Sequence, residues 1–497
     1  MQLLKSVRQT VLRVCTALFA MVFAGFLNAC SSSDDDTITE TDNSVPMSST
    51  VSALLFEPCE GTTMLDCGAF EVPLIHGSTD NRSLSINVAR LPGTGSGPHE
   101  PLLINLGGPG SGIEVLQDFA SFNLLPASVR EQFDVYGFDQ RGVANPLRID
   151  CDLLGNVDAA YPRDQNDVQT LVDDSTMLAD ACSAEFADQL QWVGSNSVVQ
   201  DIEILRTKLG TPMLNIIGVS FGTRITALYL ERFPNTSGRI ILDASLPPGA
   251  TIESLLTVPA EARQDSFEQM LNVCGTIVPD CDRLTIEDTF VSRVNNLLDE
   301  GDQETFNAFF DLLEAATEES DVAEILGPFL VDFALSGNSA QILSLVAMND
   351  LEDDESDDVN DSITLERAVF CADDSTRPTF DSLVTTLGSL NEISDLFAEA
   401  IVGDIGSACV SWPEALDPVS DIHTVDGPAA LVIGGADDVV TPISWSIATA
   451  EAIGGVLLTS DHQGHTTLFV RSNECVDSIA VEYLIDGTLP QEGTRCN

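Results

Sequence analysis

Short runs of apolar residues recur along most of the chain, and each is bounded by turn-forming residues. Several runs are continuous rather than alternating, which is typical of strands buried on both faces of a parallel sheet. The predicted strands are Leu84–Leu91, Leu102–Leu106, Phe133–Phe138, Leu214–Val219, Ile240–Asp243, Ala429–Gly434 and Val456–Thr459. Helical patterns lie between them; in Ser197–Leu209, the residues Val198, Ile202 and Leu205 form one apolar stripe. This alternation predicts a doubly wound α/β sheet.

The alternation is interrupted after Gly249. Residues 250–405 instead carry helix-like patterns of apolar residues together with many acidic ones. The helices predicted in this segment are Ile252–Val258, Ser266–Val273, Asp288–Leu298, Glu304–Ala315, Asp321–Phe333 and Ala340–Met348. Strand-like runs resume only at Ala429, so we expect a helical lid inserted between two strands of one sheet. Residues 51–249 and 406–497 then form the first and the C-terminal part of the core that contains the sheet.

The first 29 residues have the organisation of an export signal. They contain three basic residues and no acidic one, and the apolar run Val14–Leu27 is short for a membrane span. The run leads to Leu-Asn-Ala-Cys, which resembles the bacterial lipoprotein signal whose cysteine, here Cys30, becomes the lipidated first residue. The alternative is ordinary signal cleavage with Cys30 incidental. Ser31 follows Cys30, and by analogy with such lipoproteins this favours the outer membrane.

Residues 30–50 form the next segment, which is polar, acidic and free of apolar periodicity after Cys30. Such a composition is typical of a flexible tether. The expected location is therefore outside the cytoplasm, with a lipid anchor in the bacterial outer membrane and the folded part facing the periplasm or the cell surface.

The composition of the chain is strongly acidic. Its 497 residues include 21 Lys and Arg against 78 Asp and Glu, which gives a formal net charge of −57. This balance excludes a nucleic-acid binder, because phosphate contacts need basic patches, and it makes electrostatic docking to anionic lipid improbable. Hydrophobic residues make up 44% of the chain, enough for a core and against disorder. Acidic surfaces of this kind are typical of proteins from salty environments.

Ten cysteines remain when Cys15 and Cys30 are set aside, and they fall in sequence-local pairs. An even number on an exported chain predicts disulfides. Connectivity cannot be deduced from sequence alone, and pairing of neighbours is the simplest pattern. The neighbouring pairs are Cys59/Cys67, Cys151/Cys182, Cys274/Cys281, Cys371/Cys409 and Cys475/Cys496. Metal binding is a weaker alternative, because there is no Cys-x-x-Cys and the chain has only five histidines.

The run Leu214–Val219 ends in the sequence Gly-Val-Ser-Phe-Gly, and a helical pattern follows it. This is the G-x-S-x-G arrangement, in which a tight strand-to-helix turn exposes a serine hydroxyl and the glycines let neighbouring backbones approach closely. The bare motif is also compatible with a structural turn. Its position between a strand and a helix favours a nucleophile, so we predict this role for Ser220.

A second glycine-rich loop, Asn105–Gly112, reads N-L-G-G-P-G-S-G and also follows an apolar strand. Backbone N–H groups in such a loop can point at the oxygen on which negative charge develops in acyl transfer. Pro109 has no N–H, so the predicted oxyanion donors are Gly108 and Phe221. A phosphate-binding loop is the alternative, but the sequence lacks G-K-[ST] and its spacing misses G-x-G-x-x-G.

A serine nucleophile needs a base and an acid that orients the base. Asp437 and Asp438 stand side by side after a predicted strand, and their position leaves the two level. His462 and His465 are the histidines that complete the chain order Ser, Asp, His. One of them is expected to take the serine proton, because imidazole titrates near working pH.

Together these motifs resemble the secreted α/β-hydrolase peptidases of the tripeptidyl aminopeptidase and proline iminopeptidase type. The resemblance covers roughly residues 55–497 and includes, in the family's order, NLGGPGSG, DVYGFDQRGVANP, GVSFGT, GGADDVVTP and GHTTL. It implies an α/β-hydrolase fold with a mostly parallel sheet and the lid inserted before the strand that carries the acid.

The resemblance also assigns the acid and the base. GGADDVVTP is similar to the family's G-x-x-D-P-V-T-P pattern, and counting back from Pro442 makes Asp438 the acid, with Val439 in place of the usual proline. GHTTL makes His465 the base.

Further roles follow from the same resemblance. The lid stretch RAVFCADDSTRP resembles a family C-x-E-D stretch, which implies that Asp373 and Asp374 hold the free α-amino group of the substrate, although Asp in place of Glu shortens the reach. Asp139 and Arg141 are interpreted as scaffold that supports the glycine-rich loop.

The predicted activity is acyl transfer from a short peptide with a free amino terminus to Ser220, as in tripeptidyl or prolyl aminopeptidases. No metal, no organic cofactor and no protein partner is expected. One alternative is a carboxylic-ester hydrolase on the same scaffold, because fold does not determine substrate. The other is a non-catalytic surface lipoprotein that kept the fold as a binding module.

Overall fold

The computed structural model describes residues 54–144, 147–151, 161–272, 275, 283–349, 358–422, 427–461, 464–471 and 473–497. The predicted signal peptide, the lipidation at Cys30 and the tether lie outside these described residues. None of the helices within the described ranges combines the length and the hydrophobicity that a membrane span requires.

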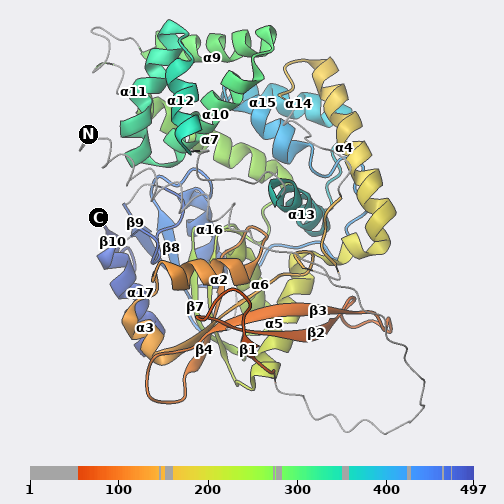
Figure 1. The fold of residues 1–497 in the computed structure, drawn as a ribbon, viewed down its shortest axis with the longest axis vertical. Coiled ribbons are helices and arrows are strands. Elements are labelled where there is room, and N and C mark those ends of the chain that lie inside the picture. Colours follow the sequence, from red (N-terminus) through yellow and green to blue (C-terminus); the bar gives the residue numbers. More distant parts are fainter. Residues whose placement is uncertain are drawn as a thin grey trace.

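A ten-stranded sheet runs through the described part of the chain in the order β1-β2-β3-β5-β4-β6-β7-β8-β9-β10 (Figure 1). The strands are β1 (Glu57–Pro58), β2 (Asp66–Pro73), β3 (Ser83–Leu91), β4 (Glu100–Asn105), β5 (Phe133–Phe138), β6 (Leu214–Val219), β7 (Ser237–Asp243), β8 (Leu431–Gly435), β9 (Val456–Ser460) and β10 (Arg495–Cys496). The first pairings, β1 with β2, β2 with β3 and β3 with β5, are antiparallel. All pairings from β5–β4 onward are parallel. The predicted mostly parallel sheet is therefore confirmed.

All seven predicted strands occur, with ends that differ by at most a few residues. The prediction missed β1, β2 and β10. Two of these, β1 and β10, have only two residues each. The third, β2, exposes Glu71 between the buried Phe70 and Val72, so it lacks the continuous apolar run that marks a strand buried on both faces.

Helices cover both faces of the sheet because successive strand residues point to opposite sides. Within β6, Ile216 belongs to the apolar core that includes α5 and α6, whereas Ile217 belongs to the core that includes α2, α3 and α17. The helices around the sheet are α2 (Gly112–Ser121), α3 (Ala127–Gln132), α4 (Gln165–Phe186), η1 (Ala187–Trp192), α5 (Ser195–Leu209), α6 (Phe221–Arg232), α16 (Ile443–Ile453) and α17 (Glu474–Asp486). The sheet is thus doubly wound.

A helical segment, residues 252–406, lies between β7 and β8, as the sequence predicted. In Figure 1 most of it lies above the sheet. Its helices are α7 (Ile252–Leu271), α9 (Arg283–Glu300), α10 (Gln303–Glu318), α11 (Ser320–Ser336), α12 (Ala340–Asn349), α13 (Asp358–Asp373), α14 (Phe380–Asn391), α15 (Ala398–Ile401) and η2 (Val402–Gly406). It has an apolar core of its own in which phenylalanine rings contact one another, such as Phe267 with Phe290 and Phe309 with Phe333.

The prediction of two separate helices at the start of this segment is wrong. Residues 252–271 form the single helix α7, which continues through Pro259. Its first half packs Leu255 and Leu256 into the core shared with the sheet, and its second half packs Phe267 into the core of the helical segment. Burial at both ends outweighs the hydrogen bond that the proline removes.

Neighbouring cysteines pair as the sequence predicted. Disulfides join Cys59 to Cys67, Cys151 to Cys182, Cys371 to Cys409 and Cys475 to Cys496. The pair Cys274/Cys281 lies outside the described residues. Cys371 lies in the last turn of α13, so its disulfide with Cys409 ties the helical segment to the stretch that leads back into the sheet.

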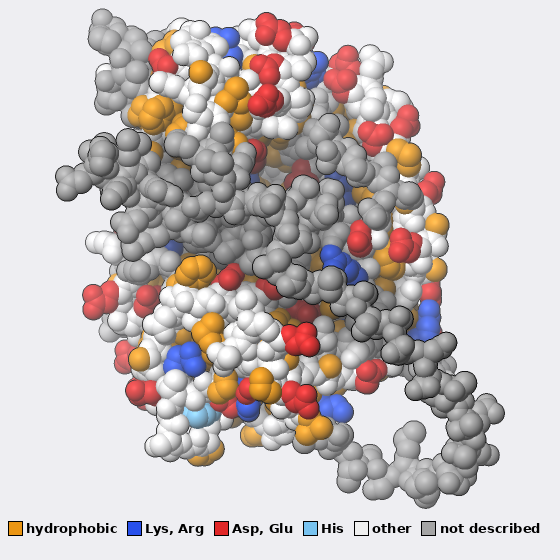
Figure 2. Space-filling view, in the orientation of Figure 1, with side chains coloured by type: hydrophobic (Ala, Val, Ile, Leu, Met, Phe, Trp, Pro, Cys, Tyr) orange, Lys and Arg blue, Asp and Glu red, His pale blue; other side chains and the backbone are white. Residues whose placement is uncertain are grey.

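Acidic side chains are scattered over the face of the molecule seen in Figure 2, with few Lys and Arg among them. Several other acids are buried and paired. Asp201 on α5 is fully buried, and its two oxygens accept from Arg141 Nε and Nη2, each at 2.7 Å. Arg141 also donates to the carbonyls of Leu74 and Trp192. Arg141, which follows β5, therefore joins α5 to the end of β2 and to the end of η1. Its role is structural.

Replacing Asp201 with Ala should lower the free energy of unfolding by about 3–5 kcal/mol, because it leaves the buried Arg141 guanidinium without its counter-charge. Urea denaturation followed by tryptophan fluorescence measures this loss. Asp188→Ala is the matched control, because it removes an exposed partner of Arg82 and should change stability far less. Equal losses in the two variants would contradict the prediction.

Candidate functional site

Ser220 lies in the turn between β6 and α6 and has φ 53° and ψ −126°, a conformation that residues other than glycine rarely adopt. The turn is held on both sides. The N–H of Ser220 donates to the carbonyl of Asp243 at 3.0 Å, and the Thr223 hydroxyl donates to the carbonyl of Ser220 at 2.6 Å. The side chain of Ser220 is therefore presented on a strained and fixed turn, as the motif predicted.

The glycines of the motif are required by close backbone approach. A Cβ on Gly218 would come 2.4 Å from Thr226 Oγ1, and a Cβ on Gly222 would come 2.1 Å from the carbonyl oxygen of Asn105. Both distances are far below a van der Waals contact. The turn can therefore pack against its own helix and against the end of β4 only where the side chains are absent.

The glycine-rich loop that follows β4 lies directly against this turn. A Cβ on Gly107 would be 2.8 Å from the backbone nitrogen of Phe221, and both Gly107 and Gly108 have positive φ values. The N–H of Gly107 donates to Asn105 Oδ1 at 3.4 Å. Phe221 is the first residue of α6, so its N–H has no acceptor within the helix. The structure thus brings the loop of Gly108 and the N–H of Phe221 together beside Ser220.

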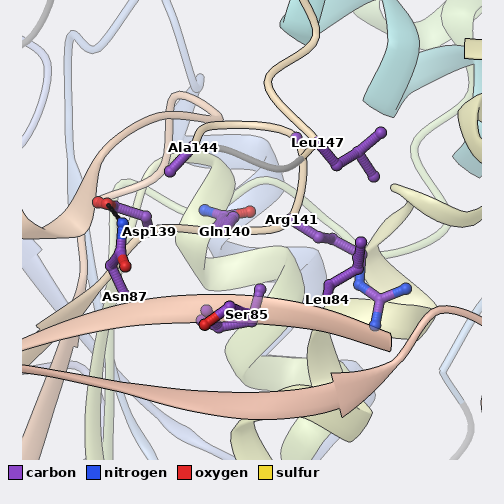
Figure 3. A pocket seen from close by; sticks show the side chains of 10 residues that line it. Leu84, Ser85, Asn87, Asp139, Gln140, Arg141, Ala144 and Leu147 are labelled. Atoms are coloured by element: carbon purple, nitrogen blue, oxygen red, sulfur yellow. Dashed lines mark hydrogen bonds between the residues drawn. The ribbon is translucent and has the colours of Figure 1, made fainter. Parts of the chain in front are cut away.

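Asp139 supports this loop, as predicted. It accepts from the hydroxyl of Ser111 at 2.6 Å. It also accepts from the amide of Asn87 at 3.4 Å, a contact drawn in Figure 3. Ser111 in turn accepts from the N–H of Glu114 and caps α2. Burial raises the pKa of Asp139, against the effect of these hydrogen bonds. Arg141 binds elsewhere, at Asp201, so the support of the loop comes from Asp139.

Asp438 and His465 come together after β8 and β9. His465 Nδ1 lies 3.0 Å from one carboxylate oxygen of Asp438 and 3.3 Å from the other. The Asp438 carboxylate also accepts from the N–H groups of Val440 and Thr441 and from the Thr441 hydroxyl, all within 2.9 Å. Asp438 is buried, whereas Asp437 is exposed. Of the two neighbouring acids, Asp438 is thus the one that orients the imidazole; His462 lies outside the described residues.

The environment of His465 favours its protonated form. Burial lowers the pKa of this imidazole, but the charge and hydrogen bond of Asp438 raise it, with smaller contributions from Glu318 and Asp243. The pKa of His465 therefore lies above its ordinary value. The carboxylate of Asp438 thus stabilises the positive charge that the imidazole acquires when it accepts a proton.

Asp243 is a residue that the sequence analysis did not assign. It ends β7, is buried, and one of its carboxylate oxygens accepts from the N–H groups of Thr467 and Leu468, both at 2.8 Å. Burial raises the pKa of Asp243 to about 6. Asp243 therefore holds the loop that carries His465. A charged residue at the end of an otherwise apolar strand was the signal that could have identified it.

Asp373 and Asp374 both bind protein groups at helix N-termini. Asp373 is 1% exposed; its oxygens accept from the N–H and the hydroxyl of Ser195, at 2.7 and 2.5 Å, and one lies 3.7 Å from Arg224. Asp374 accepts from the N–H of Ile252 at 2.8 Å. These contacts anchor α5 and α7 and give both acids a structural role. The role of the two acids as anchors for a substrate ammonium stays a prediction.

Within the described ranges, no group of three or more His, Cys, Asp or Glu side chains is arranged to hold a metal ion.

Two family models match this chain. The model described as "alpha/beta hydrolase fold" matches residues 100–278, which include the glycine-rich loop and Ser220. The model described as "TAP-like protein" matches residues 396–496, which include Asp438 and His465.

Several curated proteins are similar over most of the chain. Serine protease Hip1 of Mycobacterium tuberculosis is 28% identical over 458 residues, which cover 86% of this chain and 87% of that protein. Carboxylesterase B of the same species is 26% identical, with 86% of each chain covered. A tripeptidyl aminopeptidase of Streptomyces coelicolor is 28% identical over 192 residues, 37% of this chain and 36% of that protein.

Among solved structures, a proline iminopeptidase of Mycobacterium smegmatis is 15% identical and covers 84% of this chain and 98% of that chain. Its TM-score of 0.37 is too low to support an argument. The family models and the sheet topology are sufficient for the fold: the chain is an α/β hydrolase in architecture, similar over most of its length to a curated serine protease and to a curated carboxylesterase.

Proposed function

We propose that the protein is a serine hydrolase that cleaves short peptides from a free amino terminus through an acyl-enzyme on Ser220. The observation that carries the proposal is the hydrogen bond between His465 and Asp438 in a chain whose Ser220 lies on a strained strand-to-helix turn. Similarity to a serine protease and, over a shorter stretch, to a tripeptidyl aminopeptidase supports a peptide substrate.

The proposed steps assign one role to each group. His465 Nε2 takes the proton of the Ser220 hydroxyl as the oxygen attacks the carbonyl carbon, and later gives that proton to the leaving amine. Asp438 keeps the proton of His465 on Nδ1 and stabilises the imidazolium. The N–H groups of Gly108 and Phe221 stabilise the oxyanion, and the loss of one such donor typically lowers kcat by about 10²–10³-fold. Water then releases the acyl group from Ser220.

The preference for a free amino terminus is supported by an acidic cluster in the helical segment, formed by Glu314, Glu318, Glu366 and Asp404. The charge of Glu318 raises the pKa of His465, and the charge of His465 in turn lowers the pKa of Glu318, so this member of the cluster interacts with the proposed base. The charge of Glu314 raises the pKa values of Glu318 and Asp404, and the charge of Asp404 raises the pKa of Glu366, so the four acids form one connected group.

The cluster faces a space that solvent can reach. Glu314, Glu318 and Glu366 are partly accessible and Asp404 is exposed, yet burial is the main cause that raises the pKa of Glu318, Glu366 and Asp404, in the case of Glu366 to about 8.

Among the described residues of this region, guanidinium groups are fewer than carboxyl groups. Arg263 donates to Glu314 at 2.6 Å and to Glu318 at 3.0 Å, and the charge of Arg367 acts on Glu366 and Asp404. Two guanidinium groups therefore face four carboxyl groups. A substrate ammonium would stabilise the ionised forms of these acids, including Glu366, whose pKa of about 8 otherwise keeps it protonated near pH 7. This is the physical reason for expecting selection of a free amino terminus here, beside the earlier prediction for Asp373 and Asp374.

A carboxylic-ester hydrolase is the second candidate, and the similarity to carboxylesterase B favours it. The same serine, base and acid serve both reactions. A non-catalytic surface lipoprotein is the third, and it predicts an unreactive Ser220.

We further propose that the protein is exported and attached through a lipid on Cys30 to the bacterial outer membrane. The described disulfides support an oxidising compartment, because such bonds persist mainly outside the cytoplasm.

Aminoacyl-, dipeptidyl- and tripeptidyl-anilides, each with a free and with an acetylated amino terminus, test the substrate class. Acetylation should lower kcat/KM by about 10–10²-fold, because it removes a charge-assisted contact worth about 1.5–3 kcal/mol. A fluorophosphonate probe should label the protein and should fail to label Ser220→Ala, which should also lose hydrolysis of every substrate.

Three results separate the candidates. Labelled protein that cleaves free and acetylated anilides equally would retain the serine hydrolase and reject the aminopeptidase. Labelled protein that cleaves esters but no anilide would support the esterase. Absence of labelling together with absence of turnover would support the binding module.

The pH profile of kcat/KM tests His465 as the base. An imidazole accepts a proton only when neutral, so kcat/KM should rise as pH increases through the pKa of His465, with a midpoint above the ordinary value of 6.5. Glu318→Gln removes a charge that raises this pKa and should move the midpoint to lower pH. An uncharged ester substrate keeps the substrate's own amine out of the titration.

Asp188→Asn is the matched control for this measurement. It removes an exposed carboxylate that pairs with Arg82 and does not act on the pKa of His465, so it should leave the midpoint unchanged. A wild-type midpoint below 6.5, or a midpoint that Glu318→Gln leaves unchanged, would argue against the assigned environment of His465.

A further inference from the structure

We propose that Glu319 and Arg471 form a clamp that joins the helical segment to the base loop, residues 464–471, and so positions His465 for the reaction. Glu319 and Arg471 are positioning residues in this proposal, since they act through His465. The inference rests on the proposed role of His465 as the base.

The ion pair at the centre of the clamp is partly buried and bidentate. Glu319 lies at the junction of α10 and α11 and is 2% exposed. Arg471 Nη1 donates to one of its oxygens at 2.6 Å, and Arg471 Nη2 donates to the other. Two parallel hydrogen bonds of this kind fix the direction of both side chains as well as their distance.

The same guanidinium holds the backbone beside His465. Arg471 Nη2 donates to the carbonyl of His465 at 2.9 Å, and Arg471 Nε donates to the carbonyl of Thr466 at 2.8 Å. One planar group therefore bridges a carboxylate of the helical segment and two consecutive carbonyls of the base loop. Lysine cannot make this bridge, because an ammonium lacks the planar fork.

The base loop also lies directly against the carboxylate. Gly464 precedes His465 by one residue and has φ 118°, and a Cβ there would come 2.3 Å from Glu319 Oε2. Only glycine permits this approach. The loop and the helical segment are therefore in contact on both sides of His465, through Gly464 before it and through Arg471 after it.

The conformation of the loop explains why it needs anchors. Thr466 has φ 65° and Phe469 has φ 64°, left-handed conformations that are strained for residues other than glycine. Asp243 holds the N–H groups of Thr467 and Leu468 from the sheet. Arg471 holds carbonyls of the same loop and ties them to the helical segment, so His465 is held from two bodies at once.

The charge of the clamp is poised near neutral pH. Burial raises the pKa of Glu319 to about 7, the charge and hydrogen bonds of Arg471 lower it, Glu318 raises it and His465 lowers it. These are the titratable groups that face Glu319 from α10 and from the base loop. Protonation of Glu319 weakens its bond with Arg471, and therefore loosens the link to His465, as pH falls below about 7.

Glu319→Gln and Arg471→Met test the clamp. With enzyme concentration set by fluorophosphonate titration, each should lower kcat by about 10–10²-fold, the size of effect that misplacing a catalytic group by about 1 Å produces, and should change KM little. The double variant should lose no more than the worse single variant, because both remove one link. Arg471→Lys should not restore kcat.

The pH profile separates positioning from stability. In Glu319→Gln the acidic limb of kcat should lose the component that titrates near 7 and keep only the component of His465. Glu268→Gln is the matched control, because it breaks an ion pair with Arg283 between α7 and α9 of the same segment without contact to the base loop; its kcat should stay unchanged.

Glu319→Gln keeps the size and shape of the side chain, so it gives the decisive result even where Arg471→Met does not fold. A folded Glu319→Gln with wild-type kcat and an unchanged acidic limb would overturn the clamp. Full activity in Ser220→Ala or His465→Ala would instead overturn the proposed function, which makes the two failures distinguishable.

Discussion

Close approach of two backbones at the ends of β4 and β6 is the constraint on which the site depends. These neighbouring parallel strands bring Asn105 and Gly218 into register, so the loops that follow them must share one small space. That space admits no side chain at Gly107 or Gly222, whose added Cβ atoms would overlap backbone atoms of the other loop. Once the loops are in contact, the turn of Ser220 is left in its strained conformation, and the backbone of the glycine-rich loop lies beside it.

Buried acids organise the rest of the structure around this turn. Asp201 fixes Arg141, Asp139 fixes the start of α2, Asp373 and Asp374 anchor α5 and α7, and Asp243 holds the base loop. Each of them accepts hydrogen bonds from groups that would otherwise be unsatisfied, which is how a buried carboxylate becomes tolerable. In a chain with a formal charge of −57, these few acids determine how helices meet the sheet.

The helical segment contributes residues to the surroundings of the proposed base. It supplies the acidic cluster, through Glu318, and the carboxylate of Glu319 that binds Arg471. Two consecutive residues at the end of α10 therefore act on the proposed base. The charge of Glu318 raises the pKa of His465, and Glu319 binds Arg471, which in turn binds the carbonyl of His465. The position of α10 and the electrostatics of His465 are linked by this arrangement, because a shift of the helix would alter both.

The sequence by itself determined the doubly wound sheet, the helical segment and the turn of Ser220, because apolar periodicity and glycine spacing are local properties. For the cysteines it offered pairing of neighbours only as the simplest pattern, and the structure confirmed that pairing for the four pairs that it describes. Position alone did not decide whether Asp437 or Asp438 is the acid that orients the base, and the resemblance to a family assigned Asp438. Only the tertiary structure showed which acid meets His465, that Asp373 and Asp374 cap helices, and that Asp243, Glu318 and Glu319 surround the base. An acid's role depends on which residues, distant in sequence, surround it after folding, and among 78 acids no local pattern carries that information.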